Sequence, residues 1–131
     1  MNIGQIVIFF NKTGKYIGEI TAQYPGGYTV KTKAVLNHPR QGDLHNPNQV
    51  DVPFFHERKA LAWKEQTNIP EKMVRPFEET IPEYKQSLVN AVEKFENQLL
   101  TKDDPFAQKS LDALREIKKE YALMYAIDFS N

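Results

Sequence analysis

The chain has no cysteine among its 131 residues. This absence excludes disulfides, thiol catalysis, thiolate metal sites and a lipid-modified cysteine within the sequence. No apolar run approaches the ~18 residues that a membrane-spanning helix requires. The first residues, MNIGQIVIFFNKTGK, lack a basic region and soon reach glycine and charge, so we expect no signal peptide and a cytoplasmic protein.

A net charge is also missing, since 17 basic residues balance 17 acidic ones. The charges are unevenly spread: residues 1–77 hold ten Lys and Arg against six Asp and Glu, and residues 78–131 hold seven against eleven. This division indicates two structural parts that attract each other, and it is too small to indicate nucleic-acid binding. Hydrophobic residues at 40% and aromatic residues at 11% suffice for a core.

The first third of the chain has the period of two that is typical of strands. A half-buried strand, with one apolar face, is predicted from residues separated mostly by two: Ile3, Ile6, Ile8 and Phe10. Residues 11–15 predict a turn in which Gly14 supplies a positive φ. The strand YIGEITAQY and the strand YTVKTKAVL flank Pro25-Gly26-Gly27, which predicts a hairpin turn.

The middle of the chain is harder to interpret. Residues 38–49, HPRQGDLHNPNQ, predict a polar loop, followed by a short extended stretch at Val50 and Val52. The segment HERKALAWKEQ admits a helix, but its apolar residues are contiguous, so we favour a strand with Leu61 and Trp63 on one side and allow a helical turn at 54–58. The ending from Ile69 to Phe77 resembles that of SH3-type barrels, in which a strand, one 3₁₀ turn and a short last strand close the barrel.

After residue 78 the apolar period becomes about 3.6 residues, which predicts two helices. Thr80 is the expected cap of the first helix, with Pro82 in its first turn and Glu83 completing a capping box, and Asp104 is the expected cap of the second. The first apolar stripe comprises Tyr84, Leu88, Val92, Phe95 and Leu99, and the second comprises Ala107, Leu111, Leu114, Ile117, Tyr121 and Met124 or Tyr125. We therefore expect a mainly β plus α fold: a small antiparallel SH3-like barrel over residues 1–78 and an antiparallel helical hairpin over 79–131, forming one structural unit.

Catalytic and metal-binding patterns are weak. His56-Glu57 resembles the start of a zinc-protease HExxH motif, but Ala60 stands where the second histidine is required. His38, Asp43, His45 and Asp51 could converge on a metal, although histidines in polar loops are usually solvated. We expect no catalytic, cofactor-binding or metal-binding residues, and therefore no enzyme. Phe54 and Phe55 are adjacent, so both are buried only if the local backbone bends or a second element, the helical hairpin or a partner, covers one of them.

Three stretches carry a resemblance to a known family: KTGKYIGEI (12–20), HPRQGDLHNP (38–47) and FFHERKALAWKEQTNIP (54–70). On these the chain resembles the kinase-associated protein B family of sporulation proteins. The resemblance implies an SH3-like barrel with a helical extension and an accessory role for a membrane sensor histidine kinase in the sporulation phosphorelay. The family has been described as lipoproteins, whereas this sequence has no cysteine, so we expect membrane contact only through a partner.

The first hypothesis is therefore a non-enzymatic module that binds and activates a kinase or its regulator. Its candidate partner-binding residues are Arg40, Asp43, His45, Phe54, Phe55, His56, Glu57 and Arg58. All of these except Phe54 and Phe55 are expected outside, near one another at one rim of the barrel. Leu61, Ile69 and Val74 are expected inside. Two alternatives remain open, a nucleic-acid or transcription-machinery binder and an enzyme using the loop 38–51. The oligomeric state is not indicated by the sequence.

Overall fold

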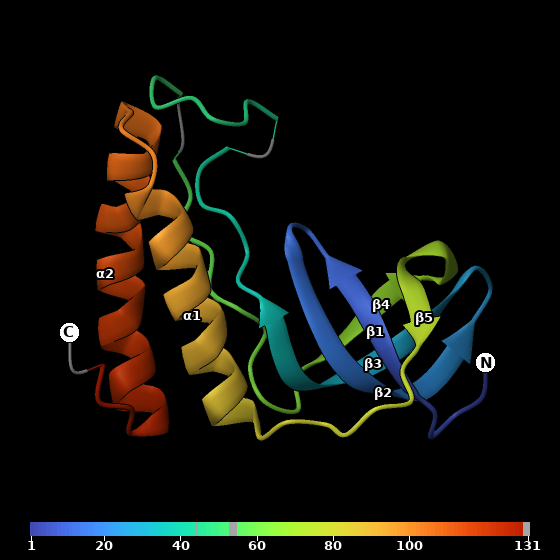
Figure 1. Cartoon of the computed structure of the whole chain (residues 1–131). Helices are drawn as coiled ribbons and strands as arrows, with labels where there is room; N and C mark the ends of the chain where they lie inside the picture. Colours follow the sequence, from blue (N-terminus) through green and yellow to red (C-terminus); the bar gives the residue numbers. More distant parts are fainter. Residues whose placement is uncertain (44, 53–54, 130–131) are drawn as a thin grey trace.

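Strands fill the first part of the chain and helices the last, in a computed structural model that describes residues 1–43, 45–52 and 55–129 (Figure 1). The strands are β1 (Ile6–Asn11), β2 (Gly14–Tyr24), β3 (Gly27–Asn37), β4 (Gln66–Pro70) and β5 (Val74–Pro76). A 3₁₀ turn, η1 (Glu71–Met73), joins the last two strands, and α1 (Tyr84–Leu100) and α2 (Pro105–Tyr125) follow.

The strands form one antiparallel sheet in the order β4-β3-β2-β1-β5. The pairing of the long strands β2 and β3 shifts register at three places, and such irregularities bend a sheet. The bent sheet brings β1 against β4, and α1 lies over β3 (Figure 1). The predicted fold class, a small SH3-like barrel followed by a helical hairpin, is confirmed.

The buried face of β1 differs from the predicted one. Val7 and Phe9 are 0% exposed, whereas Ile6 and Ile8 are only half-buried and Ile3 is 64% exposed. A one-residue shift in a strand exchanges its two faces, and the continuous apolar run IVIFF contains no polar residue to distinguish them. The prediction that Ile6 and Ile8 belong to the inner face was therefore wrong.

Two tight turns join the first three strands. Gly26 in the β2–β3 turn has φ +90°, so the predicted Pro-Gly hairpin is confirmed. In the β1–β2 turn the residue with a positive φ is Lys12, at 55°. The prediction that Gly14 supplies the positive φ was therefore wrong. Gly14 is required for a different reason, because a Cβ atom there would lie 2.4 Å from the hydroxyl oxygen of Tyr16.

The predicted closing sequence of the barrel is confirmed, with β4, η1 and β5 in that order. Ile69 at the end of β4 and Val74 at the start of β5 are 1% and 5% exposed. Met73 is partly buried against the same core. The proline-initiated 3₁₀ turn thus reverses the chain between two short strands while its flanking apolar side chains fill the end of the barrel.

The helices carry the predicted stripes on their buried faces, but α1 begins later than predicted. Its N-cap is Glu83, without a side-chain cap hydrogen bond, so the expected Thr80 cap was wrong. The helix begins where Tyr84 and Ser87 reach the barrel, and the Oγ of Ser87 accepts a hydrogen bond of 3.0 Å from the amide of Val35. The cap of α2 is as predicted, since Asp104 accepts a bond of 2.7 Å from the amide of Ala107.

Candidate functional site

The segment 55–65 connects the loop to β4 and forms neither the favoured strand nor the alternative helix. Leu61 is only partly buried, and Trp63, expected beside it, is 54% exposed. Backbone amides and carbonyls that are shielded from water still need partners. In this segment side chains from several other elements supply them, which explains why the segment is ordered without regular secondary structure.

Three tyrosine hydroxyls bind the backbone of residues 60 and 61. Tyr121 of α2 accepts from the amide of Ala60 at 2.7 Å, and Tyr16 of β2 accepts from the amide of Leu61 at 3.3 Å. Tyr84 of α1 donates to the carbonyl of Leu61 at 2.6 Å. Burial raises the pKa of Tyr16 to about 12 and raises the pKa of Tyr84 and Tyr121 as well, so all three hydroxyls keep their protons.

His38 extends this network and is not solvated, contrary to the expectation for a loop histidine: it is 4% exposed. Its Nδ1 lies 2.9 Å from the carbonyl of Pro39, which only accepts, so Nδ1 carries the proton. Its Nε2 therefore accepts from the hydroxyl of Tyr121 at 2.8 Å. Burial lowers the pKa of His38 to about 4, outweighing the opposite effect of the bond to Pro39. The ring stacks on Phe95 with centroids 5.5 Å apart.

The loop and the segment 56–58 lie side by side, held by the buried Gln41. Its side chain accepts from the amide of Arg58 at 2.8 Å and donates to the carbonyl of Arg58 at 2.9 Å. The amide of Gly42 donates to the carbonyl of His56 at 2.9 Å, and the guanidinium of Arg58 donates to the carbonyl of Gly42. Two stretches proposed from the sequence as one rim, 40–43 and 56–58, are therefore adjacent.

The predicted partner-binding residues differ in accessibility. Arg40, His45, His56 and Glu57 are exposed. Asp43 carries a lowered pKa because its carboxylate accepts hydrogen bonds from the side chain of Asn46 and from the amide of His45. Arg58 is half-buried and binds its own loop, so it contributes to the structure of the rim as well as to its surface. Phe54 lies outside the described residues.

Phe55 is covered by the helical hairpin, one of the two possibilities that its position in the sequence left open. Its ring centroid lies 5.8 Å from that of Phe106 in α2, and the Nζ of Lys109 lies 4.8 Å from the Phe55 ring. Phe55 is thus half-buried by α2 and joins the helices to the loop.

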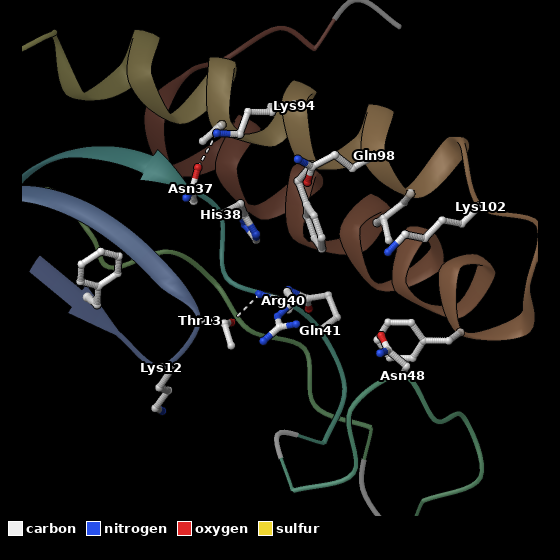
Figure 2. A pocket seen from close by; sticks show the side chains of 15 residues that line it. Lys12, Thr13, Asn37, His38, Arg40, Gln41, Asn48, Lys94, Gln98 and Lys102 are labelled. Carbon is white, nitrogen blue, oxygen red and sulfur yellow. Dashed lines mark hydrogen bonds between the residues drawn. The ribbon is translucent and has the colours of Figure 1, made fainter. Parts of the chain in front are cut away.

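A cleft of about 520 Å³ opens beside the rim, between the β1–β2 turn, the loop and α1 (Figure 2). Of its lining residues, only Arg40 and His38 were considered as site residues from the sequence. The cleft also holds Lys12 of the turn, Lys94 of α1 and Lys102 just beyond α1. The four-residue spacing of Lys94 and Gln98 on one face of α1, continued by Lys102 just beyond the helix, is the sequence signal that could have indicated it.

The described part of the chain has no cluster of side chains suited to a metal ion and no helix suited to crossing a membrane. Across residues 1–43, 45–52 and 55–129, no three His, Cys, Asp or Glu residues are grouped so that they could hold a metal ion. In the same ranges no helix has the length and apolar character needed to cross a membrane.

Comparisons with known proteins agree with this architecture. A family model described as "Kinase associated protein B" matches residues 11–122. Over 118 residues the chain is 55% identical to the "Kinase-associated lipoprotein B" of Bacillus subtilis (strain 168), covering 90% of this chain and 92% of that protein. The crystal structure of kinase-associated protein B from Bacillus cereus is similar with a TM-score of 0.79 at 46% identity, covering 92% of this chain and 97% of the other. The chain belongs to the kinase-associated protein B family.

Proposed function

We propose that this chain is a non-enzymatic accessory protein that binds a membrane sensor histidine kinase, or a regulator of one, and supports its activation in the sporulation phosphorelay. The single observation that carries the proposal is membership of the kinase-associated protein B family, with 55% identity to a relative whose name states the kinase association. In this proposal the protein works on the cytoplasmic side, and contact with the membrane comes through the kinase. It needs no cofactor.

The rim formed by residues 40–43, 45 and 56–58 is the proposed binding surface. The side chain of Gln41 forms hydrogen bonds with the backbone of Arg58 and so links the two stretches. The side chains of Arg40, His45 and Glu57 are exposed beside this link. A surface that is already ordered loses little conformational entropy when a partner binds. Charged and polar side chains on such a rim favour specific recognition and fast association.

The test is the autophosphorylation rate of a purified cytoplasmic region of a sensor histidine kinase, measured with and without the protein. We expect the protein to raise the rate, and Glu57→Lys to require about tenfold more protein for half of the effect, because a like-charge contact in an interface is strongly unfavourable. Glu71→Lys is the matched control, since Glu71 is also exposed but lies on η1. Both variants should melt within a few degrees of the parent protein.

Two further substitutions differ in whether they separate binding from folding. Phe54→Ala is expected to weaken the kinase response without changing the melting temperature. Arg58→Ala does not separate binding from folding, because Arg58 donates a hydrogen bond to the carbonyl of Gly42 and its loss disturbs the loop. If the protein leaves the kinase rate unchanged at every concentration, the proposed function is wrong. If Glu57→Lys and Glu71→Lys stimulate equally, the rim is not the binding surface.

A further inference from the structure

The cleft beside the rim concentrates positive charge. Its four cationic residues are Lys12, Arg40, Lys94 and Lys102, and no Asp or Glu lies among the described residues that line it. The cations come from three separate parts of the chain, the β1–β2 turn, the loop and the end of α1, and Figure 2 shows the side chains of Arg40, Lys94 and Lys102 around the opening. Folding alone therefore brings like charges together, at an electrostatic cost.

Exposed lysines are usually no more than solvated surface groups, so a second feature must distinguish these. Some basic side chains elsewhere on the described surface have acidic neighbours, as Lys33 has Glu19 at 3.5 Å and Lys118 has Glu96 at 3.0 Å, while others, such as Lys72, form no ion pair with a described residue. What distinguishes the cleft is that four cations line one hollow that no described Asp or Glu lines. Within the described residues none of the four cleft cations forms an ion pair. Lys94 is directed instead by a hydrogen bond to the side chain of Asn37. The cleft is thus a cationic site without an internal counterion.

The walls of the cleft are partly apolar. Phe95 and Leu99 of α1 line it together with Phe106 of α2. Phe95 and Leu99 also pack in the interior, and Phe106 packs against Phe55. A hollow with apolar walls strengthens the attraction between its charges and an incoming anion, because less water screens them. The same walls offer contact area to a ligand that carries an apolar group between its charges.

One carboxylate lies close by, in the hollow that adjoins the cleft. Asp43 lines that hollow with Lys12 and Arg40. Its two oxygens are occupied by the amide of His45 at 2.9 Å and the side chain of Asn46 at 3.1 Å, so it is bound within its own loop. Asp43 therefore lies at the edge of the cationic region and does not neutralise Lys94 or Lys102.

We propose that the cleft binds an acidic segment of a protein partner, with Arg40, Lys94 and Lys102 pairing with its carboxylates and an apolar side chain of the segment lying on Phe95. This inference rests on the proposed function and deepens it, because it names the chemistry of the bound segment and adds a second contact surface beside the rim. A peptide is favoured over a nucleic acid for two reasons. The cleft is small, about 520 Å³, and the part of the chain beyond residue 77 carries eleven acidic residues against seven basic ones, which repels a long polyanion.

The experiment uses fluorescence anisotropy with the full chain and a fluorescein-labelled peptide of eight residues, six glutamates and two leucines. A peptide with glutamine in place of each glutamate controls for apolar binding, and an eight-nucleotide oligothymidine tests the nucleic-acid alternative. The variant K94Q/K102Q removes two of the four cleft cations while keeping a polar side chain at each position. The variant K72Q/K119Q makes the same change in net charge at two exposed lysines that do not line the cleft.

We expect the acidic peptide to bind and the glutamine peptide not to bind. The substitutions K94Q/K102Q should lower the affinity for the acidic peptide about tenfold, and K72Q/K119Q should change it less than twofold. Equal weakening by the two variants would overturn the proposal, as would tighter binding of the oligothymidine than of the peptide. If the parent protein does not bind the acidic peptide but stimulates the kinase normally, the proposal for the cleft is refuted and the proposed function is not. Peptide binding that depends on Lys94 and Lys102, without stimulation of the kinase, supports the cleft and refutes the proposed function.

Discussion

Acid should destabilise this protein through His38 at pH values where exposed histidines have no such effect. In the folded state His38 is neutral until the pH reaches about 4, whereas in the unfolded chain it binds a proton near pH 6.5. Between these values the unfolded state holds more protons, so the free energy of unfolding falls as the pH falls. The contribution is complete above pH 6.5, declines through this window and is lost below about 4.

The size of the effect follows from the difference between the pKa of His38 in the folded protein and its pKa in the unfolded chain. A tenfold change in proton affinity corresponds to about 1.4 kcal/mol, so the full loss is about 3 kcal/mol. A domain of this size has a total stability of roughly 5–15 kcal/mol, so the loss is large. Its structural origin is the burial of His38, which disfavours the charged ring. The hydrogen bond from Tyr121 occupies Nε2, the nitrogen that a second proton would have to take.

The assay is urea unfolding at a series of pH values from 7.5 to 4.5 for the parent protein and for His38→Gln. Glutamine cannot titrate and keeps an oxygen that can accept from Tyr121, so the variant should lose the histidine component of the pH dependence. His45→Gln is the control, because it makes the same chemical change at an exposed histidine outside the Tyr121 network. An NMR titration of the parent ring protons gives the pKa of His38 even if the variant fails to fold. A pKa near 6.5, or parallel curves for the parent and His38→Gln, would refute the reasoning.

Three further predictions concern the helices. Leu114→Ala, at a position 0% exposed, should reduce the free energy of unfolding by roughly 2–5 kcal/mol in urea denaturation, and a loss below ~1 kcal/mol would contradict its burial. Tyr84→Phe should cost about 1–3 kcal/mol because it leaves the carbonyl of Leu61 without its partner, and an unchanged urea midpoint would show that water replaces the hydroxyl. A chain that ends at Phe77 should have a much lower melting temperature than the whole chain in circular dichroism, since its barrel loses the hydrogen bonds of Tyr84, Ser87 and Tyr121. Equal melting temperatures would mean that the barrel and the hairpin are independent.

Elements that depend on neighbours along the chain could be predicted from the sequence. The Pro25-Gly26 turn, the order of strand, 3₁₀ turn and strand after Asn68, and the apolar stripes of both helices follow from local turn chemistry and from the period of the hydrophobic residues. The Asp104 cap belongs to the same group, because its hydrogen bond reaches only three residues ahead. The rim was also partly anticipated, since residues 40–43 and 56–58 are adjacent as predicted.

Features that depend on contacts between distant residues became visible only in the folded chain. The run IVIFF gives no indication of which face is buried until the rest of the barrel encloses Val7 and Phe9. The segment 55–65 has no period of its own, because its backbone is satisfied by hydroxyls from β2, α1 and α2. The burial of His38 and the gathering of cations in the cleft likewise join side chains more than fifty residues apart. Local pattern specifies which elements form, but long-range hydrogen bonding and packing specify what those elements bury and present.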